Sequence, residues 1–442
     1  MKQADTIFAL ASAAGRAGVA VVRISGSEAR QIFSLCKPRE LPTPRLASLR
    51  NLHNPENGDL IDRGLLLWFP APHSFTGEDV VEIHIHGGRA VLEALVGCLR
   101  KFPSFRLAEA GEFTRRAFEN DKLDLTEAEA LADLVNAETE AQRRQALRQF
   151  EGALSQFYEN WRLQLTKILA HLEALIDFSD EDLPKEVEEK NISEIRLLIA
   201  EITRHLDDRR CGERLRDGFS VAILGPPNAG KSSLLNVLAR REAAIVSSMA
   251  GTTRDVVEVH LDLGGYPVTL ADTAGLRESR ETIEGEGIKR ALARAEKADL
   301  KLLVFDGEKW PAFDATTAKL KSDNTILIVN KADLIAAPNS HAGIDLFISA
   351  QTGQGIAELI DKIIAAIDIY FTNVGPPALT RARHRAALEE CSTHLQCALK
   401  ASAAELRAED VRLALRALGR ITGCVDVEDL LDVIFRDFCI GK

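Results

Sequence analysis

The stretch that decides the fold runs from Phe219 to Leu238 and reads FSVAILGPPNAGKSSLLNVL. Its apolar beginning predicts a buried strand, and its end predicts a helix. Between them, Gly225 to Ser232 have the spacing Gly-x4-Gly-Lys-Ser of a loop whose backbone N–H groups surround phosphate oxygens. Because strand and helix supply the context that this motif needs, the sequence predicts a nucleotide-binding α/β domain rather than a chance glycine-rich turn.

The side chains of this loop have different expected roles. Lys231 reaches the β and γ oxygens and acts in catalysis, while the Ser232 hydroxyl can bind magnesium. Two further magnesium contacts are expected, directly from Thr253 in the stretch AGTTRD and through water from Asp272. The nucleotide contacts predicted in the loop itself are Asn228, Ala229, Gly230, Lys231, Ser232 and Ser233.

The base-binding residues are predicted in NTILIVNKADL, a buried strand that delivers Asn330, Lys331 and Asp333 at its carboxyl end. A carboxylate there can accept both the N1–H and the exocyclic amine of guanine, donors that adenine does not offer together. Asp333 is therefore expected to select GTP over ATP. Ser349 and Ala350, in FISAQTG, can support the base through their backbone.

The segment LADTAGLRES contains the Asp-x-x-Gly turn of GTPases, formed here by Asp272, Thr273, Ala274 and Gly275. The next residue is often a glutamine that orients the attacking water, but here it is Leu276. No arginine finger, which supplies about 10³ to 10⁵ in rate, can be identified in the chain, and a monovalent cation is one physical replacement. The acids that could act on the water, each also explained as a solvated residue, are Glu278, Glu281, Glu284 and Glu286.

Bulk composition limits the remaining classes. A chain of 442 residues predicts two or three domains, and a net charge of -11 argues against coating nucleic acid through a global positive field. Seven scattered cysteines without a Cys-x-x-Cys pair fit a reducing cytosol. No apolar run approaches the about 18 residues of a membrane span, and the first five residues lack the pattern of a signal peptide. The expected location is cytoplasmic.

Three textures follow one another along the chain. Short apolar runs such as GVAVVRIS and DVVEIHIHGG predict an N-terminal α+β domain over 1–120. Apolar residues at three- and four-residue spacing predict helices over 121–214, one of them opened by a capping box of Thr126 and Glu129. After the linker NVGPPALT the helices return over 376–442, so 215–375 is predicted to be inserted into a discontinuous helical bundle.

Seven stretches of the sequence lie in all three segments and at both ends of the chain, whereas other GTPases share only the central ones. They are DTIFALASAAGRAGVAVVRISG, NDKLDLTEAEALADL, GPPNAGKSSLLN, AGTTRD, DTAGLRE, NKAD and DFCIGK. Together they resemble one family, the MnmE (TrmE) tRNA-modification GTPases. The resemblance implies a folate-binding-like N-terminal domain, a discontinuous α-helical bundle and an inserted Ras-like P-loop GTPase domain.

This resemblance implies a potassium-dependent GTPase that is activated when its G domains dimerise. Asn228 binds potassium through its side chain, and the backbone carbonyls of Ser247, Met249 and Thr252 complete the shell. The family's acid falls at Glu284, with Glu281 and Glu286 left open. The nucleotide contacts implied in the same loop are Ser247, Ser248, Met249, Ala250, Gly251, Thr252 and Thr253.

The resemblance further implies that the first domain binds 5,10-methylene- or 5-formyltetrahydrofolate and forms a homodimer. The matching folate positions are Arg23, Glu82, Lys122 and Lys442. His84 and His86 share a strand face with Glu82, and a folate-pocket lining or packed histidines are favoured over a metal cluster.

The tail CIGK has the outward form of a prenylation box, but its glycine and final lysine argue against lipidation. The resemblance instead implies that Cys439 is a catalytic residue that tRNA modification requires. Whether its thiol takes part directly in the chemistry is left open.

The predicted function is formation of a 5-carboxymethylaminomethyl or 5-aminomethyl group on the wobble uridine (position 34) of tRNA. An FAD-dependent protein of the MnmG (GidA) family is the implied partner, in a heterotetramer or larger complex. Two alternatives remain open, an Era-like ribosome-assembly GTPase and a folate-dependent one-carbon transferase with a regulatory G domain. The basic clusters that could contact tRNA or the partner, or be solvated faces, are Arg143, Arg144, Arg209, Arg210, Arg381, Arg383 and Arg385.

Overall fold

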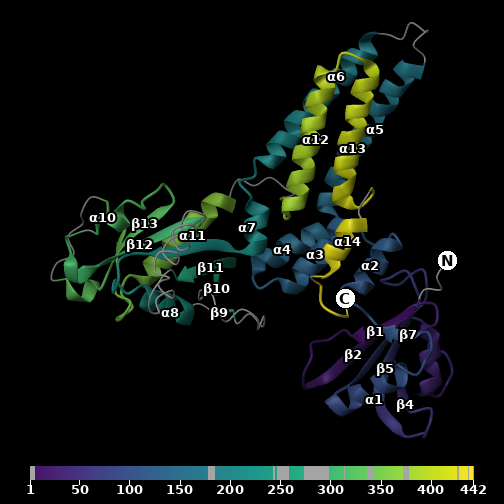
Figure 1. Ribbon diagram of the computed structural model, residues 1–442. Helices are drawn as coiled ribbons and strands as arrows, with labels where there is room; N and C mark the ends of the chain where they lie inside the picture. Colours follow the sequence, from purple (N-terminus) through teal and green to yellow (C-terminus); the bar gives the residue numbers. More distant parts are fainter. Residues whose placement is uncertain are drawn as a thin grey trace, which may run out of the picture. The chain divides into compact units, whose positions relative to one another are not determined.

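A computed structural model describes residues 5–177, 185–241, 244–245, 258–272, 298–312, 314–335, 343–371, 378–425, 428–436 and 438–441. Figure 1 shows its elements coloured along the sequence. The chain divides into two compact units. The first comprises Met1–Ala132, Phe150–Arg162 and Arg416–Lys442, and the second comprises Asp133–Gln149 and Leu163–Leu415. Among the described helices, none has the length and apolar character needed to cross a membrane.

The first unit contains a seven-stranded sheet in the order β3-β4-β5-β6-β2-β1-β7. Burial alternates along β6, where Val81, Ile83 and Ile85 enter the core and Glu82 and His84 lie on the opposite face. Helix α1 (Arg89–Leu99) and the 3-10 helix η1 (Ala29–Leu35) cover the core face. The strands are β1 (Thr6–Leu10), β2 (Ala17–Ser25), β3 (Cys36–Lys37), β4 (Ser48–His53), β5 (Leu60–Phe69), β6 (Val80–Gly87) and β7 (Phe105–Leu107).

Three helices complete this unit's described core, namely α2 (Glu112–Glu119), α14 (Glu428–Arg436) and the first part of α3 (Leu125–Asn136). The predicted capping box of Thr126 and Glu129 is wrong. Asp124 is the cap, because its Oδ1 accepts from the Glu127 N–H at 2.9 Å and Glu127 Oε2 accepts from the Asp124 N–H at 2.9 Å. Glu129 is instead buried.

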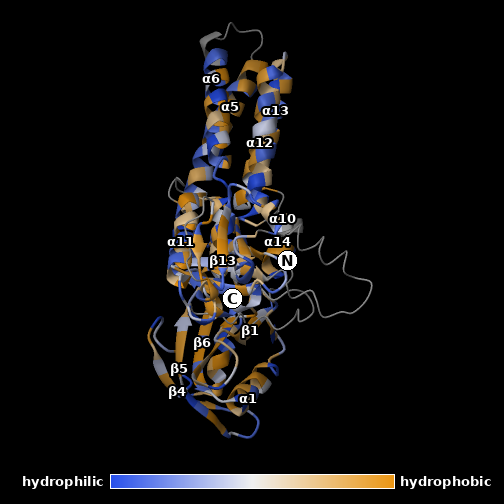
Figure 2. Cartoon of the chain, turned by 90° about the vertical axis from the view of Figure 1, so that its left-hand side faces the viewer, coloured by the Kyte–Doolittle hydropathy of each residue, from blue (hydrophilic) through white to orange (hydrophobic). Residues whose placement is uncertain are grey.

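Helices from before and after the nucleotide domain pack together in the second unit. Helix α6 (Lys185–Leu206) lies against α12 (Ala382–Lys400), and Arg407 Nη1 reaches Glu188 Oε1 at 2.6 Å. Figure 2 shows hydrophilic and hydrophobic residues on each long helix, as two-faced packing requires. The other described helices of this region are α4 (Glu140–Phe150), α5 (Ala153–Asp177), α7 (Cys211–Asp217) and α13 (Ala404–Thr422). Most of the predicted linker, residues 373–377, lies outside the described residues.

The nucleotide domain has a second seven-stranded sheet in the order β14-β13-β12-β8-β11-β10-β9. Strands β8, β12 and β13 are parallel and almost wholly buried, because helices or loops cover both faces. Helices α8 (Lys231–Arg241) and α11 (Ile356–Phe371) form the larger core with one face. The predicted α/β domain is confirmed. Its strands are β8 (Phe219–Leu224), β9 (Ala244–Ile245), β10 (Glu258–Leu263), β11 (Tyr266–Asp272), β12 (Leu300–Asp306), β13 (Thr325–Asn330) and β14 (Leu346–Phe347).

Two isoleucines on α11 test whether burial against the sheet stabilises this domain. Ile363 is fully buried, whereas Ile369, on the same helix, is 64% exposed. Ile363→Ala leaves a cavity and is expected to cost about 2–5 kcal/mol, while Ile369→Ala should stay within about 0.5 kcal/mol. Amide hydrogen exchange of the intact chain should therefore be at least about tenfold faster in β8 and β12 for the first variant only. Equal exchange rates in the two variants would contradict this assignment of the core.

Candidate functional site

The phosphate loop connects the end of β8 to the start of α8 and is shaped by two glycines. A Cβ on Gly225 would lie 2.2 Å from the Val304 carbonyl oxygen, and one on Gly230 would lie 2.2 Å from Asn330 Nδ2. Both residues also have positive φ angles, 157° and 85°, which favour glycine. The glycine spacing of the motif is thus required by neighbouring protein groups as well as by phosphate.

The ammonium of Lys231 already lies within the loop. Its Nζ donates to the carbonyl oxygens of Gly225 at 3.0 Å and Pro226 at 2.9 Å. A lysine in this position can exchange carbonyl oxygens for the β and γ oxygens of a nucleotide. Ser232 and Ser233 follow in the first turn of α8, whose N-terminal end favours an anion.

One buried side chain, Asn330, joins the phosphate loop to the base-binding segments. Its Nδ2 donates to the Ala229 carbonyl at 2.9 Å, and its Oδ1 accepts from the Ala350 N–H at 3.0 Å. The three motifs predicted separately from sequence therefore meet at one amide. Ser349 is buried beside them.

The expected base-selecting carboxylate, Asp333, lies in the short 3-10 helix η4 (Ala332–Leu334) directly after Asn330 and Lys331. It is exposed, and its carboxylate has no hydrogen-bond partner in the part of the chain that the structure describes. An exposed and unpaired carboxylate is available to a base.

The remaining predicted nucleotide residues are only partly described. Asp272 ends β11, where its backbone pairs with Ile223 of β8. Residues 246–257 and 273–297 lie outside the described residues. The loop from Ser247 to Thr253, the turn from Thr273 to Gly275 and the acid at Glu284 therefore stay predictions.

Two of the predicted folate residues, Arg23 and Glu82, are directly opposite each other on β2 and β6. Arg23 Nε donates to Glu82 Oε1 at 2.9 Å, and the guanidinium lies 5.7 Å and 5.8 Å from the centres of the Phe75 and Phe113 rings. Arg23 Nη1 also donates to the Gly441 carbonyl at 3.4 Å. The carboxyl-terminal tail is thus brought to this pair.

Further contacts hold that tail in place. Ile440 forms a β-bridge with Ala110, and the Gly111 N–H donates to the Cys439 carbonyl at 3.4 Å. The thiol-bearing residue Cys439 is exposed, whereas burial raises the pKa of Cys36 and of Cys391 to about 12 and keeps these thiols protonated. Lys442 lies outside the described residues.

Lys122 and the two histidines contact other groups. A Cβ on Gly77 would lie 3.0 Å from Lys122 Cε, so this lysine packs on the 74–78 loop. His84 Nε2 is 3.6 Å from Glu82 Oε2, but His86 Nδ1 pairs with Asp62 Oδ1 at 2.8 Å. Within the described ranges no group of three or more His, Cys, Asp or Glu residues could hold a metal ion.

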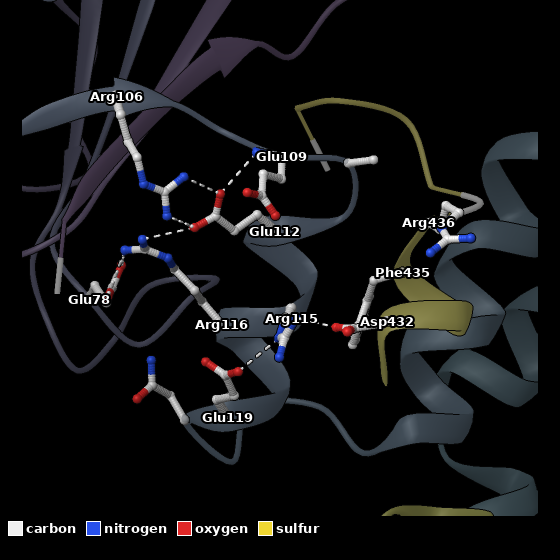
Figure 3. A pocket seen from close by; sticks show the side chains of 12 residues that line it. Glu78, Arg106, Glu109, Glu112, Arg115, Arg116, Glu119, Asp432, Phe435 and Arg436 are labelled. Atoms are coloured by element: carbon white, nitrogen blue, oxygen red, sulfur yellow. Dashed lines mark hydrogen bonds and ion pairs between the residues drawn. The ribbon is translucent and has the colours of Figure 1, made fainter. Parts of the chain in front are cut away.

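Sequence reasoning missed a charged cavity of about 700 Å³ between α2 and α14 (Figure 3). Glu112 lies between two arginines, because Arg106 Nη2 reaches its Oε1 at 2.6 Å and Arg116 Nη2 does so at 3.0 Å. Burial opposes ionisation of Glu112, yet hydrogen bonds from Arg106, the Glu109 N–H and Arg116 hold its pKa below its ordinary value. The signal in the sequence was the i,i+4 charge pattern of GEFTRRAFE.

The predicted basic clusters are largely paired within the chain. Arg143 and Arg144 both contact Glu140 Oε1, at 2.8 Å and 2.7 Å. Arg381 pairs with Asp133 at 2.6 Å, and Arg385 with Asp208 at 2.6 Å and with Glu213 at 3.0 Å. The pairs of Arg381 and Arg385 are part-buried and support packing, whereas Arg143 and Arg144 lie on an exposed helix face. Arg209 and Arg210 are exposed and adopt positive φ angles of 52° and 57°.

Comparisons with known proteins agree with this geometry. The family model described as the GTP-binding protein TrmE N-terminus matches residues 6–122, and the MnmE helical domain matches residues 125–439. The tRNA modification GTPase MnmE of Paramagnetospirillum magneticum is 56% identical over 99% of this chain and 100% of its own length. That of Parvibaculum lavamentivorans is 57% identical over the same shares.

A solved structure, the G domain of the T. maritima FeoB iron transporter, is 28% identical with a TM-score of 0.26. It covers 33% of this chain and 97% of its own. The full-length identity, together with the phosphate and base loops that Asn330 joins, identifies the chain as a GTP hydrolase that acts in tRNA modification, and it belongs to the MnmE (TrmE) family.

Proposed function

We propose that this GTPase is potassium-dependent and that it forms the 5-carboxymethylaminomethyl or 5-aminomethyl group on uridine 34 of certain tRNAs. A one-carbon tetrahydrofolate supplies the carbon, and an FAD-dependent protein of the MnmG (GidA) family is the partner. The observation that most supports the nucleotide chemistry is the pair of hydrogen bonds made by the Asn330 amide. One joins it to Ala229 of the phosphate loop and the other to Ala350 of the predicted base-binding segment. The tRNA substrate and seven free cysteines favour the cytoplasm.

In this proposal the chain itself supplies the groups around the triphosphate. Ser232 and Thr253 hold magnesium, with Asp272 acting through water. Asn228 contributes its amide oxygen to potassium beside the carbonyls of Ser247, Met249 and Thr252, a position from which positive charge can replace an arginine finger. Asn228 has a φ of 65°, a left-handed conformation that asparagine adopts more readily than most residues.

The folate proposal rests on the chemistry of the Arg23–Glu82 pair. A carboxylate can accept from pterin donors, while arginine and lysine can pair with the carboxylates of the folate's glutamate. Phe75 and Phe113, which flank the guanidinium, give this place an apolar wall. The contact of Arg23 with Gly441 supports a role there for the neighbouring Cys439 and Lys442.

The homodimer proposal rests on the open face of the first sheet. Leu49 and Leu65 are directly opposite on β4 and β5 and are 51% and 40% exposed. Leu65 is also opposite His84, whose side of the sheet carries Glu82 and Arg23. An apolar exposed face of this kind favours an isologous contact with a second copy, which would then lie next to the folate residues.

We further propose that α7 carries the change in the G domain to the helices. On one side, Arg214 Nε pairs with Asp299 Oδ1 at 2.6 Å and its guanidinium lies 4.9 Å from the Tyr370 ring. On the other side, the Gly212 carbonyl accepts from Gln145 Nε2 at 3.3 Å, and Glu213 pairs with Arg385. In the sequence, Asp299 comes 15 residues after Glu284, the acid that this proposal places at the water. Helix α7 is therefore linked both to the nucleotide domain and to the helical bundle.

Replacing potassium by sodium tests the cation proposal. Steady-state GTP hydrolysis is expected to fall at least about tenfold in sodium chloride, since the cation substitutes for a group worth about 10³ to 10⁵ in rate. Asn228→Ala should abolish the difference between the two salts. Asn236→Ala, on the exposed face of α8, is the matched control and should keep it. Equal turnover of the unaltered protein in both salts would refute potassium dependence.

A charge on the open sheet face tests the dimer. Leu65→Glu is expected to weaken self-association about 100-fold, because the carboxylate would have to be buried without a partner. Light scattering after size-exclusion chromatography should then report the monomer mass. Leu406→Glu, at a leucine 61% exposed on α13, is the control and should remain dimeric. A dimeric Leu65→Glu variant excludes this face as the interface.

The route through α7 is tested by separating hydrolysis from modification. Arg214→Ala removes the ion pair with Asp299, so modified uridine in cellular tRNA should fall about tenfold while GTP turnover changes less than about twofold. Arg216→Ala is the matched control, because Arg216 on the same helix pairs with its neighbour Asp217 at 2.6 Å. Nucleoside analysis and hydrolysis assays measure the two effects. Losses of equal size in both assays would show that α7 only supports folding.

A further inference from the structure

The turn that begins at Asp306, the last residue of β12, is joined to the base-binding segment 330–333 by the buried Asp306 carboxylate. Asp306 Oδ1 and Oδ2 are 3.0 Å and 3.1 Å from Lys331 Nζ, and the Asp306 side chain is only 5% exposed. Glu308 Oε1 is also 3.1 Å from Lys331 Nζ, but this side chain is 57% exposed. The two acids therefore differ sharply in how well solvent screens their attraction to the lysine.

The same turn is fixed in shape by Asp306 itself. Its side chain accepts from the Glu308 N–H at 3.1 Å and so caps the 3-10 helix η3 (Gly307–Lys309). A Cβ on Gly307 would lie 2.4 Å from the Asn330 carbonyl oxygen. The turn and the base-binding segment are consequently in backbone contact, with no room for a side chain between them.

Lys331 has a backbone conformation that needs outside support. Its φ angle is 62°, in the left-handed region that non-glycine residues rarely adopt. Its carbonyl accepts from the Leu334 N–H at 3.0 Å, which closes η4 around Asp333. Burial opposes the charge of Lys331, yet hydrogen bonds to Asp306 and Glu308 raise its pKa above the ordinary value. The direction of η4 therefore depends on where the lysine is held.

We propose that Asp306 is a positioning residue for guanine recognition: by holding Lys331 it sets the orientation of η4 and so aims Asp333 at the base. No residue of the β12 turn belongs to the motifs that predict base binding, so this role is additional to them. Asp306 itself does not have to touch the nucleotide. Its effect is expected on affinity and base selectivity, and not on the hydrolytic step.

Binding of three nucleotides to the full chain tests this role. Asp306→Asn keeps the size and the cap while it removes the charge, and should lower GDP affinity about tenfold, as expected for a hydrogen bond to a charged group. Calorimetry with IDP, which lacks the exocyclic amine, should show a reduced preference for GDP over IDP. ADP binding should stay weak. KM for GTP should rise while kcat changes less than about twofold.

Two further variants keep the test decisive. Glu308→Gln removes the exposed partner and should change GDP affinity less than about twofold. Asp306→Asn combined with Lys331→Met should lose no more affinity than Lys331→Met alone, because the two side chains act through one contact. If Asp306→Asn does not fold, Asp306→Glu, which shifts the charge by one methylene, should show a smaller loss of the same kind. Unchanged GDP affinity, equal losses for GDP and IDP, or additive losses in the double variant would overturn the proposal.

Discussion

The nucleotide site depends on the two hydrogen bonds of one amide, that of Asn330. Its donor and its acceptor are both used inside the protein, toward Ala229 and Ala350, so the side chain is satisfied although it is 2% exposed. Because the donor lies 2.2 Å from where a Cβ of Gly230 would be, the glycine of the phosphate loop makes room for the amide. The conformation of the phosphate loop and the position of the base-binding segments therefore depend on the same side chain, and a change in one is expected to alter the other.

In the first unit, glycines likewise allow a close approach, here between the carboxyl-terminal tail and the backbone of neighbouring segments. A Cβ on Gly441 would lie 2.3 Å from the Leu10 carbonyl oxygen, and one on Gly111 would lie 2.7 Å from that of Phe435. The tail thus packs backbone against backbone, and a larger residue at either position would displace it. This packing explains why a glycine stands in CIGK, where a prenylation box has an aliphatic residue.

The sequence allowed correct prediction wherever the signal was local. The phosphate loop, the strand before Asn330 and the alternation along β6 follow from spacing and periodicity within a few residues. The capping box was displaced by two residues because Asp124 and Thr126 are both good caps, and only tertiary packing of Glu129 decides between them. The partners of Arg385 and Arg381 could not be predicted from the sequence, because they are distant along the chain. Arg385, for example, is 172 residues from its partner Glu213. In one sequence such an arginine cannot be distinguished from a tRNA contact.

These long-range ion pairs select one arrangement of the segments they join, but they add little to the free energy of folding. A part-buried pair such as Arg214 with Asp299 loses much of its Coulomb energy to desolvation, so its net contribution to folding is small. Removing one partner is nevertheless costly, because the other charge remains buried and unpaired. The consequence is a contact that tolerates only one arrangement of the segments it joins. At α7 and in the turn that begins at Asp306, such a contact fixes how two segments are placed, whereas neutral packing of the same area would tolerate small shifts between them.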